Sequence, residues 1–150
     1  METPRLSSLY QQLILEHYRN PRNKAEMDEK TVEIHMANPV CGDEIRLQLR
    51  IEGDQIAEAK FVGQGCSISQ AAISMMTAKI QGASLSDAEG LAKRFTALMH
   101  GDTEVAKDRS LGDLRALQGV SKFPVRIKCA LIGFDALQEA LKKHAAEGPH

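Results

Sequence analysis

A strict alternation of apolar and polar residues over positions 44–52 constrains the fold of this chain more than any other feature. Its apolar members are Ile45, Leu47, Leu49 and Ile51. A period of two is typical of a β-strand with one buried and one solvated face. Gly53-Asp54 is a two-residue hairpin signal, and alternation resumes over 55–62 with Ala57, Ala59 and Phe61 inward. With a further strand expected at 31–37, the sequence predicts a three-stranded antiparallel meander.

The apolar pattern elsewhere has the period of a helix. It predicts helices over 6–19, from Ser67 to Gly82, from Ser84 to Gly101, and from Pro124 to Leu141. Within the first, His17 is expected to pack in the core rather than bind a metal. Residues 102–121 are mostly polar and are expected to form an insertion or lid outside the core. One helix, three strands and then helices indicate an α+β fold in a single domain over residues 1–150.

Composition narrows the function. The chain of 150 residues has a formal net charge of −1, so no basic surface suggests a nucleic-acid partner. Residues 1–5 lack the apolar core of a signal peptide, and no stretch is long enough to span a bilayer. We therefore expect a cytoplasmic protein with no membrane partner. An odd count of three cysteines in a reducing compartment favours metal binding or thiol chemistry over a disulfide framework.

Two of the cysteines lie in glycine-containing turns. In Cys41-Gly42-Asp43, between the first two strands, the central glycine lets a thiolate and a carboxylate point toward one place. In Gly63-Gln64-Gly65-Cys66, a strand ends and a helix begins. A helix N-terminus favours a thiolate over a thiol, so Cys66 is a candidate reactive or metal-binding residue.

The third cysteine, Cys129, is placed by the face of its helix. The apolar stripe of that helix centres on Ile127, Leu131, Phe134 and Leu141. Cys129 lies on roughly the opposite side, which weakens its interpretation as a buried hydrophobic residue. Arg126 shares the side of Cys129, whereas Lys128 points about 100° away.

Together these residues give four candidate metal ligands: Cys41, Asp43, Cys66 and Cys129. Tetrahedral Zn²⁺ suits three thiolates and one carboxylate, and iron is also compatible. Arg126 and Lys128 are candidates to offset the excess negative charge. No C-x-x-C pair supports a metal site, so the alternative that each cysteine is a separate small buried side chain stays open.

Three segments carry a resemblance to a known family. They are Asn38-Pro39-Val40-Cys41-Gly42-Asp43, Gly63-Gln64-Gly65-Cys66-Ser67-Ile68-Ser69 and Phe123-Pro124-Val125-Arg126-Ile127-Lys128-Cys129-Ala130. Their order and content are similar to the signature segments of the IscU/SufU/NifU-N iron–sulfur assembly proteins, whose SufE/NifU-like fold the chain is then expected to share. Lys128 stands where IscU proteins have a histidine, and the extra segment 102–121 is also similar to the SufU branch.

The resemblance to SufU implies a Zn²⁺ ion held by Cys41, Asp43, Cys66 and Cys129. It implies that Cys41 accepts sulfane sulfur from the persulfide of a SufS-type, PLP-dependent cysteine desulfurase, with Arg126 helping to position or stabilise the site. Downstream Suf assembly proteins are a further implied class of partner. The resemblance thus implies a sulfurtransferase that acts with its partner rather than a stand-alone catalyst.

Two alternatives stay open. The first is a scaffold on which an Fe–S cluster assembles on the same cysteines; Lys128 argues against it, because a protonated ammonium cannot replace a histidine ligand. The second is an interaction module stabilised by zinc with no chemistry of its own. A domain of this length does not need a structural metal to fold, which makes this module the weaker alternative.

Overall fold

The predicted meander is present. The computed structural model describes residues 8–147, and its sheet has the order β1 (Val32–Asn38), β2 (Asp43–Glu52) and β3 (Gln55–Gln64), all antiparallel. Leu47 of β2 pairs with Ile34 on one side and Phe61 on the other. Leu47 and Phe61 are fully buried, as the alternation predicted.

One inward position differs from the prediction. The register of β2 and β3 shifts between Arg50 and Ile51, so that Ile51 pairs with Ile56. Because such an irregularity moves the alternation by one residue, Ile56 is fully buried and Ala57 is only partly covered. The expectation that Ala57 begins the inward set is therefore corrected to Ile56.

The predicted helices are also present, as α1 (Ser8–Arg19), α2 (Ser67–Ile80), α3 (Leu85–Met99) and α4 (Pro124–Ala146). Ser84 caps α3, because its hydroxyl accepts a hydrogen bond from the backbone N–H of Asp87. Pro124 is the first residue of α4, where a missing N–H costs nothing. The predictions for residues 1–7 lie outside the described part of the chain.

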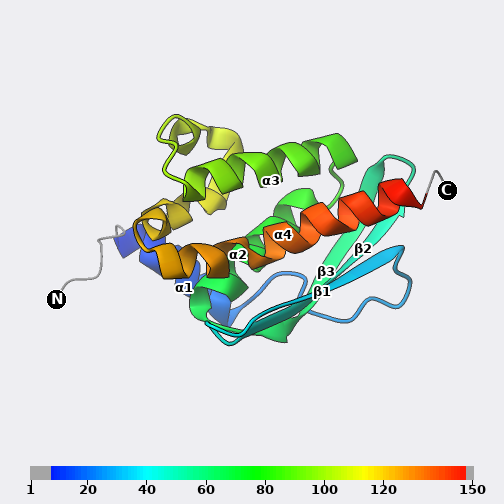
Figure 1. The fold of residues 1–150 in the computed structure, drawn as a ribbon, viewed down its shortest axis with the longest axis horizontal. Coiled ribbons are helices and arrows are strands. Elements are labelled where there is room, and N and C mark those ends of the chain that lie inside the picture. Colours follow the sequence, from blue (N-terminus) through cyan, green and yellow to red (C-terminus); the bar gives the residue numbers. More distant parts are fainter. Residues whose placement is uncertain (1–7, 148–150) are drawn as a thin grey trace.

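Helix α4 lies in the middle of the molecule. It contacts β1 and β2 on one side, α3 on another, and α2 along its flank (Figure 1). A Cβ atom at Gly133 would lie 2.9 Å from Ile73 Cγ1, so α2 and α4 approach closely at this glycine. Since α4 is covered on several sides, residues 129–134 are all buried. The sheet, α4 and α3 thus form successive layers.

The segment 102–121 contributes to the core. It forms a short 3₁₀ turn, η1 (Val105–Lys107), and the longer η2 (Arg109–Lys122), which is kinked at Gly112. Its buried residues are Leu111, Leu114, Ala116, Leu117 and Val120, and they belong to the main hydrophobic cluster. This differs from the expected lid outside the core; its status as an insertion stays a prediction.

His17 links three elements. It is 3% exposed, its Nδ1 lies 2.8 Å from Ser74 Oγ in α2, and its Nε2 lies 3.3 Å from the Asp113 carboxylate in η2. The expectation of a packed core histidine is confirmed. Among the described residues no helix has the length and apolarity needed to cross a membrane.

Candidate metal centre

Three of the four candidate ligands meet at one point. Cys41 lies in the turn between β1 and β2, Asp43 begins β2, and Cys129 lies in the second turn of α4. The two sulfur atoms and one Asp43 carboxylate oxygen all lie within 4.8 Å of one another. Gly42, between Cys41 and Asp43, has φ of 70°, a conformation that glycine adopts without steric cost. The turn thus brings both neighbouring side chains to α4.

The sulfurs of Cys41 and Cys129 are in bonding contact as a disulfide across 88 residues of chain. The two Cα atoms are 6.7 Å apart, within the range that disulfides span without backbone movement. The carbonyl oxygen of Val125, in the first turn of α4, lies 3.8 Å from Cys41 Sγ and 3.9 Å from Cys129 Sγ.

Asp43 is buried and half-satisfied. It is 2% exposed, and its Oδ1 accepts hydrogen bonds from the backbone N–H of Cys66 and the hydroxyl of Ser69, each at 3.0 Å. Its Oδ2 has no hydrogen-bond partner among the described residues. A buried carboxylate oxygen without a partner is unfavourable, and a cation beside it removes that cost. Once the Cys41–Cys129 bond is reduced, the two thiolates and the Asp43 carboxylate make a donor set that fits a zinc ion.

Two glycines of the segment before Cys66 permit close approaches, and the second of them adjoins the Asp43 carboxylate. Gly63 has φ of 137°, and a Cβ atom there would lie 2.8 Å from Ile45 Cα on the neighbouring strand. At Gly65 the requirement is space rather than backbone freedom. A Cβ atom would lie 2.5 Å from Asp43 Oδ1 and from Ser69 Oγ. Glycine at position 65 therefore leaves the room that the Asp43 carboxylate occupies.

Cys66 is adjacent to this group, but its sulfur faces another partner. It is the N-cap residue of α2, as expected, and its Sγ accepts a hydrogen bond from the backbone N–H of Ser69 at 3.4 Å. Its own backbone N–H holds Asp43 Oδ1. The structure thus gathers Cys41, Asp43 and Cys129, and it places the backbone of Cys66, not its sulfur, at the carboxylate.

The burial of Cys129 differs from what its helical face predicted. The side of α4 opposite the apolar stripe is also covered, so Cys129 is fully buried. The expectation that a core cysteine would lie on the stripe is therefore wrong, although Cys129 does meet Cys41 and Asp43. Arg126 and Lys128 are exposed, and neither forms an ion pair within residues 8–147.

The sequence interpretation passed over two residues of this region. Ser69 holds the candidate ligand Asp43, and the side-chain amide nitrogen of Asn38 is buried without a hydrogen-bond partner among the described residues. Asn38 is the β1 residue paired with Asp43. The available signal for Ser69 was its position three residues after Cys66, one helical turn into α2.

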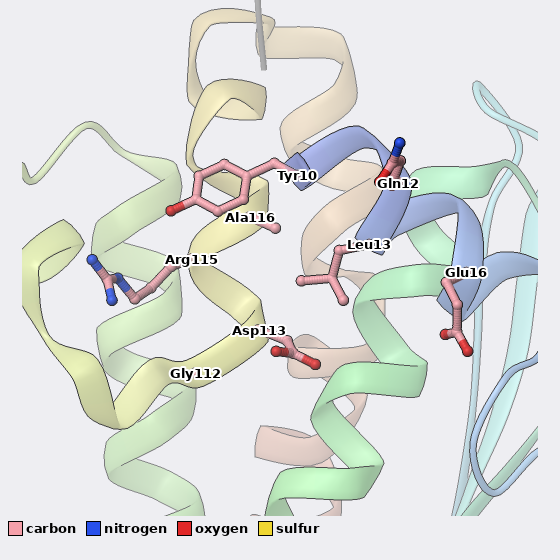
Figure 2. A pocket seen from close by; sticks show the side chains of 8 residues that line it. All are labelled: Tyr10, Gln12, Leu13, Glu16, Gly112, Asp113, Arg115 and Ala116. Atoms are coloured by element: carbon pink, nitrogen blue, oxygen red, sulfur yellow. The ribbon is translucent and has the colours of Figure 1, made fainter. Parts of the chain in front are cut away.

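A separate pocket lies between α1 and η2, with a volume of about 460 Å³ (Figure 2). Leu13 extends into it from α1, and Asp113 and Arg115 border it from η2. None of the candidate metal ligands lines it. This pocket is therefore distinct from the cysteine site.

The sequence is similar to those of known iron–sulfur cluster assembly and sulfurtransferase proteins. Over 138 residues it is 48% identical to the zinc-dependent sulfurtransferase SufU of Bacillus subtilis (strain 168), covering 92% of each chain. It is 37% identical over 145 residues to the iron–sulfur cluster assembly scaffold protein IscU of Streptococcus pyogenes serotype M1, covering 97% of this chain and 90% of that protein.

A solved structure and a family model match the chain as well. A putative iron–sulfur cluster assembly scaffold protein for the SUF system from Fervidobacterium islandicum AW-1 superposes with a TM-score of 0.78 at 30% identity, covering 86% of this chain and 93% of the other. The family model described as the NifU-like N-terminal domain matches residues 9–147. This chain therefore belongs to the NifU-like N-terminal domain family.

Proposed function

We propose that the chain is an iron–sulfur cluster assembly protein that works in the cytoplasm as a zinc-dependent acceptor of sulfur. Its sulfur donor is the persulfide of a SufS-type, PLP-dependent cysteine desulfurase. The observation that carries the proposal is Asp43, whose buried Oδ2 has no hydrogen-bond partner among the described residues and whose carboxylate gathers with the sulfurs of Cys41 and Cys129. The similarity to a zinc-dependent sulfurtransferase supports the same metal and reaction.

Exposure favours Cys41 as the acceptor. Cys41 is partly exposed, and the neighbouring Val40 is 77% exposed, so a donor sulfur from another protein can approach this turn. Cys129 is 0% exposed and cannot meet an external persulfide without local opening. The Cys66 sulfur is already engaged by the Ser69 N–H.

The transfer itself is a thiol–persulfide exchange. With the Cys41–Cys129 disulfide reduced, the Cys41 thiolate attacks the outer sulfur of the donor persulfide. A new S–S bond forms on Cys41, and the donor S–S bond breaks. The donor cysteine leaves as a thiolate, and the sulfane sulfur keeps its oxidation state. Arg126, exposed in the first turn of α4, is proposed to position or stabilise the negatively charged reacting groups.

Cys41, Asp43, Cys66 and Cys129 are proposed to hold the zinc ion, which keeps its thiolate ligands deprotonated and has no redox chemistry that would consume the sulfur. Ser69 and the Cys66 backbone hold Asp43 by one oxygen and leave the other free to bind. Cys66 would supply the fourth ligand, in exchange for the hydrogen bond that its sulfur accepts from the Ser69 N–H.

Metal analysis of the purified protein, followed by incubation with a SufS-type desulfurase and cysteine, tests this function. We expect about one zinc per chain and stimulated desulfurase turnover, with both lost in Cys41→Ala. Arg126→Ala should slow the transfer, whereas Arg109→Ala is the matched control, because Arg109 is an exposed arginine of η2.

The scaffold function is the second candidate, favoured by the similarity to a protein named as an IscU scaffold. A protein purified with iron and sulfide that leaves the desulfurase unaffected would establish the scaffold instead. Persulfide found on Cys129 and never on Cys41 would overturn the choice of acceptor. Full activity without metal would exclude the zinc mechanism.

A further inference from the structure

Cys129, proposed above as a zinc ligand, has a position that also suits it to a chemical step. It is fully buried, so it cannot take sulfur from an external donor, yet its sulfur is in bonding contact with the sulfur of Cys41. Among the thiols of the described residues, only Cys129 is gathered with Cys41 in the group of candidate ligands. The Cys66 sulfur instead caps α2.

We propose that Cys129 is the resolving thiol of this site, which releases the sulfur carried by Cys41 as sulfide. This rests on the proposed function in one respect, that a persulfide forms on Cys41. The product of the step would be the Cys41–Cys129 disulfide, which the fold accommodates with the two Cα atoms 6.7 Å apart.

The step balances without any further reactant. The Cys129 thiolate attacks the inner sulfur of the Cys41 persulfide, which is the atom bonded to Cβ. The S–S bond between that atom and the outer sulfur breaks, and the Cys41–Cys129 disulfide bond forms. The outer sulfur leaves with the electron pair and a proton as HS⁻. The sulfane sulfur is reduced by two electrons, and the two cysteine sulfurs are oxidised to the disulfide.

The surroundings suit this direction of attack. Cys41 is partly exposed, so released sulfide can leave toward solvent while Cys129 approaches from the protein interior. The proposed zinc ligation gives Cys129 a second partner. Metal occupancy therefore decides whether Cys129 is free to discharge the persulfide or Cys41 keeps its sulfur for a downstream acceptor.

The test charges the protein without any desulfurase, so that its outcome does not depend on the sulfur donor. The full chain is reduced, freed of reductant and treated with a zinc chelator, so that Cys41 and Cys129 start as thiols. It is then charged briefly with inorganic polysulfide, desalted without reductant, and followed by sulfide release and intact mass. The comparison is made in Cys66→Ser protein, in which Cys41 and Cys129 are the only cysteines. Matching circular dichroism spectra check that each variant is folded.

We expect Cys66→Ser protein to release one sulfide for each persulfide and to end two hydrogen masses below the dithiol form, with a peptide linking Cys41 to Cys129. The rate should be independent of protein concentration. In Cys66→Ser/Cys129→Ser protein the added sulfur should persist, with release slowed about tenfold or more. Equal release rates in the two variants, or a rate proportional to protein concentration, would overturn the proposal. Failure of a desulfurase to charge Cys41 would instead refute the proposed function.

Discussion

Replacing Gly65 by alanine tests whether the Asp43 carboxylate must occupy its observed position. The new Cβ atom would lie 2.5 Å from Asp43 Oδ1, 2.5 Å from Ser69 Oγ and 3.1 Å from Asp43 Cγ. Ordinary contact begins at 3.4 Å, so these oxygens must retreat by the difference, about 0.9 Å. Asp43 Oδ1 and Ser69 Oγ are the two partners of one hydrogen bond, and the new Cβ atom would clash with both. Movement of one oxygen alone therefore does not relieve the contact.

The magnitude follows from what this movement breaks. Asp43 Oδ1 accepts two hydrogen bonds at 3.0 Å, and a retreat of about 0.9 Å stretches them beyond useful length. Overpacking costs about 1–3 kcal/mol, and each hydrogen bond to a charged group contributes about 1.5–3 kcal/mol. With partial relaxation we expect a loss of about 2–4 kcal/mol, or about 5–15 °C in Tm. Zinc affinity should fall about 10- to 100-fold.

The assay pairs thermal unfolding with zinc titration against a competing chelator. Gly90→Ala is the matched control, because Gly90 lies inside α3 and its nearest contact would be Arg94 Nη1 at an ordinary 3.6 Å. Alanine is favoured over glycine in a helix by about 1 kcal/mol, so this control should be neutral or stabilising. Wild-type stability and zinc affinity in Gly65→Ala would refute the steric reasoning. Reduced stability with unchanged zinc affinity would remove Asp43 from the ligand set.

Three further predictions concern other parts of the molecule. Ser69→Ala removes one of the two donors to the candidate ligand carboxylate, so chelator competition should detect a loss of zinc affinity of about tenfold; unchanged affinity would contradict the positioning role. Leu117→Ala, at a fully buried position of η2, should lower the free energy of unfolding in urea by about 2–5 kcal/mol. The control Leu15→Ala, at a position 39% exposed, should lower it by about 0.5 kcal/mol or less. Equal effects would mean that η2 is not part of the core. Hydrogen bonds from Lys30 and a glutamine amide lower the pKa of Glu33 to about 2. The contribution of ionised Glu33 to the free energy of unfolding is therefore complete above pH 4.5 and is lost as the pH falls toward 2. Glu33→Gln should flatten the decline of stability across this range, and an unchanged decline would refute the ion pair.

The elements with local causes were predictable from the sequence. Alternation along 44–52 and the Gly53-Asp54 hairpin predicted the sheet because strand periodicity and turn chemistry are properties of neighbouring residues. The register shift at Ile51 carried no such signal, since it depends on how two strands fit together. One inward residue, Ile56, was missed for that reason.

The segment 102–121 illustrates a signal that was available but unused. Leu111, Leu114, Leu117 and Val120 recur at a spacing of three, which matches the 3.0 residues per turn of a 3₁₀ helix. The polar composition around them suggested a lid. Composition counts all residues of a segment together, whereas a helix places its apolar and polar residues on different sides. Spacing, rather than composition, indicated the buried side of η2.

The difference in exposure between Cys41 and Cys129 connects the two proposals. An acceptor must be reachable by a sulfur donor on another protein, which the exposed turn around Cys41 permits. A resolving thiol must reach the acceptor and little else, because an exposed thiol would also react with other protein molecules. Full burial of Cys129 provides that restriction, since only Cys41 brings sulfur to it. Other elements cover α4 on several sides, so Cys129 is buried although it lies opposite the apolar stripe. This burial suits Cys129 to an intramolecular step.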